Sequence, residues 1–268
     1  MKKSIICASL ILSSTLAFSF DFGSITKEVM KNVSKDSSTT TQSSNTNLST
    51  STVTNGLKEA LKVGVNYAVK NLGAKNGYLN NSLVKIPLPE NLQKAETLIR
   101  KAGGDQIAND LINSMNSAAT KAAPQTAQIF VNAIEKMSLD DAKKILNGDK
   151  NAATNYFQSH TTDSLKKLIK PIIQETMAQN SVAKYYDTFN SYYKQYGKQY
   201  VENSSLMGMA KSFGVDSYLP SSSDENLDDY VTQKAINGLF KMIAQKEAAI
   251  RSNPIEQTSS ILKQVFGG

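Results

Sequence analysis

From residue 55 onward, apolar side chains recur at the three- and four-residue spacing that places them on one face of an α-helix. The first such run is Leu57, Leu61, Ala68 and Leu72. Gly73 then provides a helix stop. No stretch of useful length alternates with the period of two that a strand needs, and residues 84–88 end among prolines. The pattern predicts an all-α fold: a single compact multi-helix domain over residues 55–268, with mostly antiparallel neighbouring helices because the connections are short.

Helix-start and helix-stop residues divide this domain into its elements. The expected helices cover residues 57–72, 90–102, 105–118, 124–137, 138–148, 154–157, 163–179, 182–200, 206–213, 228–251 and 255–266. Ser138 with Asp141 gives the clearest start signal, a capping box. Asp228 and Asp229 open what we expect to be the longest helix, where acidic side chains complement the helix dipole. His160 falls between two expected helices, in a predicted surface loop.

The N-terminus, residues 1–19, has the pattern of a secretory signal peptide. Lys2 and Lys3 precede an uncharged apolar stretch that ends in small residues, with cleavage expected after Ser19. This stretch is shorter than the roughly 20 apolar residues that span a bilayer, so a retained membrane anchor is the weaker alternative. We therefore expect an exported, periplasmic protein whose mature chain has no transmembrane span.

Residues 20–54 form an N-terminal segment that is dominated by a Ser-, Thr- and Asn-rich stretch. Such a composition cannot bury enough apolar surface to offset the entropy lost on ordering. We expect a flexible linker that connects the processed N-terminus to the helical domain at residues 55–268.

Cysteine content and charge exclude several kinds of function. Cys7 is the only cysteine and lies within the expected signal peptide, so the mature chain has no thiol for catalysis, zinc–thiolate sites or iron–sulfur clusters. The net charge of +7 is scattered, with no run of five basic residues, and we expect no nucleic-acid partner. No cofactor-binding pattern is present, and none is predicted.

Candidate catalytic motifs are weak. His160 is the sole histidine and cannot build a His-rich metal site. Ser164 and Ser181 each precede a lysine by three residues, as in the active-serine motif of penicillin-binding proteins, but the companion motifs are absent. An acidic group could suggest a calcium site, but it lacks the alternating ligands, the central glycine and the terminal glutamate of a calcium loop: Asp224, Glu225, Asp228 and Asp229. We therefore predict no catalytic residues and no metal ligands.

Several segments, taken together, resemble a bacterial family of unknown function, the one numbered 4197. They begin with the strings Gly77-Tyr78-Leu79-Asn80-Asn81 and Val84-Lys85-Ile86-Pro87-Leu88-Pro89, and continue through residues 111–119, 137–157 and 227–267. The resemblance covers nearly the whole domain. It implies an exported, helical bacterial protein with no established activity, and it supplies no catalytic residues.

The helix expected at residues 228–251 carries a candidate binding surface of polar side chains on an otherwise apolar element: Tyr230, Lys234, Glu247 and Arg251. Glu247 precedes Arg251 by one helical turn, the favourable order for an ion pair. Such a pair can bind an anion or hold a partner, or it can brace the end of a helix. Asn80 and Asn116, in the family-like segments, complete this set.

A second candidate surface is aromatic. Aromatic side chains recur at helical spacing, with Tyr186 beside them: Tyr185, Phe189, Tyr192, Tyr193, Tyr196 and Tyr200. Rows of tyrosines can stack on sugars or line an amphipathic pocket. The alternative, that the row packs against the domain with its hydroxyls at the rim, is the one we favour.

These observations favour a non-enzymatic helical module of the cell envelope that binds a protein partner or an apolar, lipid-like ligand. A carboxylate-based enzyme acting on envelope glycans and a structural envelope component remain alternatives. A cavity of several hundred cubic ångströms would favour the apolar ligand. A solid core with an exposed apolar patch would favour the protein partner. Two carboxylates facing each other about 5–10 Å apart would favour the enzyme.

Overall fold

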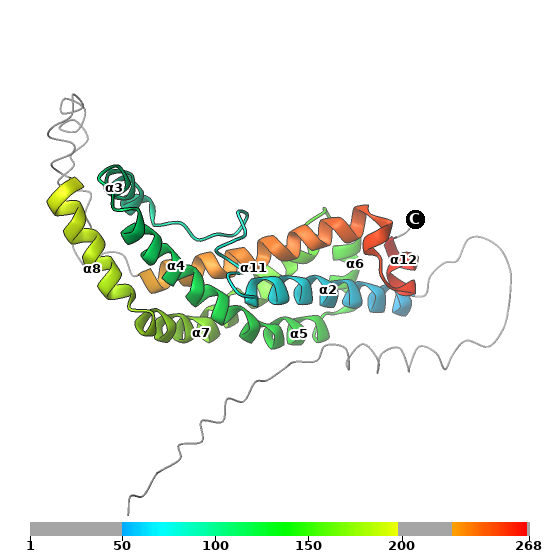
Figure 1. The fold of residues 1–268 in the computed structure, drawn as a ribbon. Helices are drawn as coiled ribbons and strands as arrows, with labels where there is room; N and C mark the ends of the chain where they lie inside the picture. The colour runs from blue at the N-terminus through cyan, green and yellow to red at the C-terminus, as the bar shows by residue number, and fades with distance from the viewer. Residues whose placement is uncertain (1–49, 198–226, 267–268) are drawn as a thin grey trace, which may run out of the picture. The chain divides into compact units, whose positions relative to one another are not determined.

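Helix α2 (Thr50–Gly73) opens the part of the chain that the computed structural model describes, residues 50–197 and 227–266 (Figure 1). It buries the apolar face formed by Leu57, Leu61, Val65, Ala68 and Leu72. The helix begins inside the segment for which a linker is predicted up to residue 54. The half-buried Val53 lies one turn before Leu57 and extends the apolar face in that direction.

The remaining elements follow with short connections. They are α3 (Glu90–Lys101), α4 (Asp105–Ala122), the 3₁₀ turn η1 (Ala123–Thr126), α5 (Ala127–Glu135), α6 (Leu139–Leu146), α7 (Ala152–Gln179), α8 (Val182–Tyr192), the π-helix η2 (Tyr193–Gly197), α11 (Leu227–Ser252), η4 (Pro254–Glu256) and α12 (Ser260–Phe266). The described residues contain no strand and form a compact helical domain, which confirms the all-α prediction. The predicted signal peptide, the linker before residue 50 and the predicted helix at 206–213 lie outside the described residues.

Helix α7 corrects two predictions. The sequence predicts two helices with a loop at His160, but α7 runs without interruption for 28 residues and is longer than the 26-residue α11. The hydroxyls of Thr161 and Thr162 donate to the carbonyls of Phe157 and Gln158, one turn back, at 2.6 Å each. These hydroxyls therefore bond within the helix instead of forming the turn that a Ser/Thr cluster favours.

Some residues that are expected to start the shorter helices do so in the structure, and others do not. The Ser138 capping box is confirmed, since Asp141 N donates to Ser138 Oγ at 3.1 Å and Ser138 N donates to Asp141 Oδ2 at 3.1 Å. Pro124 lies in η1 rather than in the first turn of an α-helix. The predicted last helix is split into η4, which Asn253 caps through a bond from Ile255 N, and α12.

Helix α11 forms the centre of the packing. It lies against α7 on one side and α2 on another, while α4 packs on α7 and α8, and α12 packs on α2 (Figure 1). The rings of Phe130, Phe157 and Phe240 join α5, α7 and α11, with edge-to-face centroid separations of 5.3 Å and 6.1 Å. Residues 74–89, between α2 and α3, form an irregular segment across α4 and α11 that we call the strap.

Candidate functional site

The strap is anchored to α11 through a buried tyrosine. Tyr78 is fully buried, and its hydroxyl donates to Ala235 O at 2.8 Å. Its ring packs on Gly238, where a β-carbon would lie only 2.6 Å from Tyr78 Cε1, so this helix position has room only for glycine. Burial raises the pKa of the Tyr78 hydroxyl far above its usual range. The ring and its hydroxyl thus fix the start of the strap.

Asn116 on α4 anchors the other end of the strap. Its side chain, 1% exposed, accepts from Ile86 N at 2.9 Å and donates to Ile86 O at 2.8 Å. It also donates to Ile112 O in its own helix, at 2.8 Å. The amide replaces the backbone partner that a strand would have, and so satisfies a buried polar segment. Asn80, by contrast, is exposed on the strap.

Tyr230 and Lys234 lie beside the end of the strap. The Tyr230 hydroxyl donates to Pro87 O at 3.0 Å, and Lys234 Nζ lies 5.4 Å from the centre of the Tyr230 ring. Lys234 is exposed. Tyr230 therefore holds the end of the strap against α11, and Lys234 places a cation at the surface.

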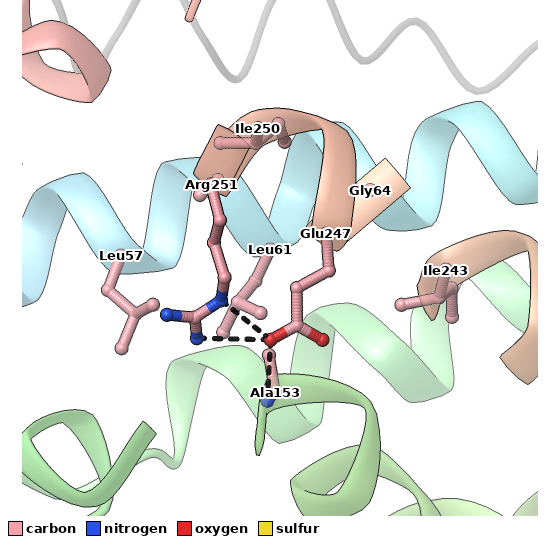
Figure 2. A pocket seen from close by; sticks show the side chains of 9 residues that line it. Leu57, Leu61, Gly64, Ala153, Ile243, Glu247, Ile250 and Arg251 are labelled. Atoms are coloured by element: carbon pink, nitrogen blue, oxygen red, sulfur yellow. Dashed lines mark hydrogen bonds and ion pairs between the residues drawn. The ribbon is translucent and has the colours of Figure 1, made fainter. Parts of the chain in front are cut away.

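Glu247 and Arg251 lie elsewhere, against the start of α7 (Figure 2). The Glu247 carboxylate is 8% exposed and accepts from Ala153 N at 3.0 Å, from Thr154 N at 2.9 Å and from Thr154 Oγ1 at 2.8 Å. Arg251 donates to the same carboxylate at 3.0 and 3.1 Å, and to Ile145 O at 2.9 Å. An anion at the first turn of a helix meets unsatisfied amides and the positive end of the dipole. The pair therefore joins α11 to the end of α6 and the start of α7.

The space beside this pair is small. Leu57, Leu61 and Gly64 of α2, with Ile243 and Ile250 of α11, enclose a cavity of about 20 Å³ (Figure 2). That volume holds about one water molecule. A drug-sized or lipid-like ligand needs roughly 300–1,000 Å³. The carboxylate here serves helix packing and does not face a ligand cavity.

The four residues predicted together on α11 thus form two separate clusters. Tyr230 and Glu247 are seventeen positions apart, which is roughly 25 Å along a helix axis. The first cluster contacts the strap and the second contacts α6 and α7. They do not form one site.

The aromatic row on α8 packs largely into the domain, which is the alternative that the sequence favours. Phe189 and the neighbouring Tyr193 are buried, and Tyr185 is half-buried against the core. Tyr192 donates to Ala102 O at 2.6 Å, beside Gly104. Tyr196 is 42% exposed and tilts against the Tyr192 ring at 4.7 Å. Tyr200 lies outside the described residues.

Other chemistry is sparse over residues 50–197 and 227–266. His160 is exposed on α7 and stacks on the Tyr156 ring at 4.2 Å. No three His, Cys, Asp or Glu side chains in these ranges come together as metal ligands. Among the described helices, none combines the length and apolar character needed to cross a membrane.

A known protein family matches most of this chain. The family described as a protein of unknown function, DUF4197, matches residues 47–267. The chain belongs to this family. No curated protein and no solved structure matches it. The DUF4197 match spans the strap, both clusters on α11 and the aromatic row, and it confirms the predicted resemblance.

Within this DUF4197 domain, the main contacts that the sequence does not predict join residues that are far apart in the chain. Ala153 and Thr154 are 94 and 93 positions from Glu247, and no local pattern pairs them. One signal is available: the first turn of α7 has no acidic residue, and Asn151 at its N-cap makes no side-chain cap bond. A helix start that lacks its own cap indicates one supplied by another element.

Proposed function

We propose that this protein is an exported, non-enzymatic helical module of the cell envelope that binds a protein partner at its surface. The observation that carries the proposal is the close packing between α2 and α11: the cavity beside Glu247 has a volume of about 20 Å³, far below the need of an apolar ligand. Recognition is then left to the surface. The export pattern of residues 1–19 supports the cellular location.

The surface feature best suited to a protein partner lies after α11. Ile255 in η4 is 85% exposed, and it borders an open hollow of about 480 Å³ together with Pro254, Gln257 and Lys263. An aliphatic side chain seated against a pocket of a partner can serve as the anchor of an interface. Burying it on a partner would contribute about 1.5–3 kcal/mol.

The turn that presents Ile255 is held firmly. Ile255 N donates to Asn253 Oδ1 at 3.0 Å, and the buried Gln257 donates to Ile250 O at 3.1 Å. Glu256 pairs with Lys246 on α11. An anchor fixed before binding loses little conformational freedom on binding, so its contribution to affinity is retained.

The alternative carboxylate enzyme has less support. Its acid and base must face each other across a cleft. Glu247, the carboxylate among the four candidate residues on α11, is bonded to two backbone amides, a hydroxyl and a guanidinium group. It is engaged in packing and has no open cleft before it.

The test uses the full chain expressed in its own cells and isolated from the periplasmic fraction. We expect a processed N-terminus and a stoichiometric complex by native mass spectrometry. Ile255→Ser should lose the partner, whereas Leu139→Ser, at a position 45% exposed on α6, should retain it. Recovery of unprocessed chain in the cytoplasm, co-purification of a lipid instead of a protein, or equal partner retention in both variants would overturn the proposal.

A further inference from the structure

Two segments that meet at the strap contain lysines and no carboxylate, although the exposed Glu90 follows directly as the first residue of α3. Residues 60–89, from α2 through the strap, contain four lysines and no Asp or Glu. Residues 230–246 of α11 contain three lysines and no Asp or Glu. Tyr78, Lys241 and Tyr230 join these two segments by hydrogen bonds along the length of the strap.

The outward side chains at this contact are cationic around one apolar residue. Val84, Ile86 and Leu88 of the strap point inward and are buried, so the alternate residues face out. Leu83 is 45% exposed and Lys85 is exposed. We call Leu83, Lys85, Lys234 and Lys241 the strap patch.

A hydrogen bond and a ring contact fix the positions of Lys241 and Lys234, the two lysines of the strap patch that belong to α11. Lys241 Nζ donates to Leu83 O at 3.4 Å. Lys234 Nζ lies over the ring of Tyr230, which in turn donates to Pro87 O. Both lysines are exposed. The Lys241 ammonium group therefore lies at the strap beside Leu83, and the Lys234 ammonium group lies beside the tyrosine that holds Pro87.

The acidic residues that border the α11 segment do not neutralise the strap patch. Asp229 pairs with Lys170 of α7 at 2.6 Å, and that bond lowers the pKa of the Asp229 carboxyl. Glu247 is buried and pairs with Arg251. Both carboxylates are thus already bound to cations outside the patch.

We propose that the strap patch docks the domain on an anionic phospholipid bilayer. Lysines near such a surface are attracted by its negative potential, and an exposed leucine among them can enter the interfacial region. A bilayer suits this patch because the cations surround an apolar side chain and no acidic side chain in either segment opposes the lipid charge. This inference is independent of the partner proposed for Ile255, which lies in a different element.

The test measures sedimentation of the full chain with vesicles of equal parts phosphatidylglycerol and phosphatidylethanolamine. Vesicles of phosphatidylcholine and phosphatidylethanolamine serve as the neutral reference. We expect binding to the anionic vesicles to exceed binding to the neutral ones and to fall as salt is raised, because salt screens exposed charges. All variants share the same first 49 residues, so differences between them report the patch.

Replacing the three patch lysines decides the question. Each lysine at an anionic surface strengthens binding about fivefold, so K85Q/K234Q/K241Q should weaken binding about a hundredfold at low salt. Leu83→Ser should weaken it roughly tenfold through lost burial.

The matched control is K143Q/K150Q/K184Q, which removes the same charge from exposed positions on other elements. It should weaken binding much less, and circular dichroism should show that all variants are folded. Equal weakening by the two triple variants, or equal binding of the unmodified chain to both vesicle types, would overturn the proposal.

Discussion

The Glu247 carboxylate on α11 receives both the backbone amide and the hydroxyl of Thr154, at 2.9 Å and 2.8 Å. Helix α7 therefore obtains its N-terminal cap from a different helix, since Asn151 makes no side-chain cap bond. Arg251 pairs with the same carboxylate and extends the contact to Ile145 O. One acidic residue thus joins three helices.

Glu247→Ala should lower the free energy of unfolding by about 3–5 kcal/mol, because it leaves a largely buried guanidinium and two backbone amides without their acceptor. Urea unfolding followed by circular dichroism measures this. The control is Glu96→Ala, which breaks an ion pair to Arg100 with the same four-residue spacing in a more exposed setting. It should cost no more than about 1 kcal/mol. Similar losses in the two variants would show that the α7 contacts contribute little.

Asn116→Ala should cost about 2–3 kcal/mol, because the buried N–H and C=O of Ile86 both lose their partner. Asn80→Ala, at an exposed position of the same strap, should change stability by less than about 0.5 kcal/mol. Thermal unfolding of both variants makes the comparison. A stable Asn116→Ala protein would mean that the strap is not held by this amide.

Two glycines within helices should respond with opposite signs to alanine. Gly238→Ala should destabilise by about 1–3 kcal/mol, because the new methyl group meets the Tyr78 ring. Gly64→Ala should stabilise by about 0.5–1 kcal/mol, since its nearest side-chain atom, on Ile243, would lie at an ordinary 4.0 Å. In a Tyr78→Leu background the cost of Gly238→Ala should shrink, and a double-mutant cycle measures that coupling. Independent effects would contradict the close approach.

Thr232→Val should stabilise the domain by about 1 kcal/mol. The Thr232 hydroxyl is buried on α11 and has no hydrogen-bond partner within residues 50–197 and 227–266, and valine has nearly the same shape without the polar atom. Thr161→Val is the matched control, because its equally buried hydroxyl donates to Phe157 O at 2.6 Å. That change should cost about 0.5–1 kcal/mol. A loss of stability in Thr232→Val would reveal a partner for its hydroxyl.

Acid should weaken the start of α6. Hydrogen bonds from Ser138 lower the pKa of the Asp141 carboxyl below its ordinary value of 3.8. The ionised form is therefore favoured in the folded state, and its stabilisation is present above pH 3.8 and lost as the pH falls through the lower folded pKa. Asp141→Asn should make stability less dependent on pH in this acidic range, as measured by urea unfolding at a series of pH values. An unchanged pH profile would contradict this assignment.

Local signals predict the fold where the cause is local. The periodicity of Leu57, Leu61 and Leu72 identifies α2, and Ser138 with Asp141 marks the start of α6 correctly. The break expected at His160 is wrong, because threonine hydroxyls can satisfy carbonyls within a helix as readily as they form a turn.

The candidate site is predicted only in part, for a related reason. The spacing of Glu247 and Arg251 identifies their ion pair, which the structure contains. It does not identify Thr154 as a further partner, since that contact depends on how α7 and α11 pack. The strap patch is likewise formed by two segments that are far apart in the chain, and only their packing brings Leu83 to Lys241.

The placement of α11 has a consequence for synthesis of the chain. Helix α2 precedes the other described helices in the chain, yet it packs on α11 and α12, which follow all the rest of them. A nascent chain that ends before residue 227 also has no carboxylate for the start of α7. The core around α2 therefore cannot close until residues 227–266 have been synthesised.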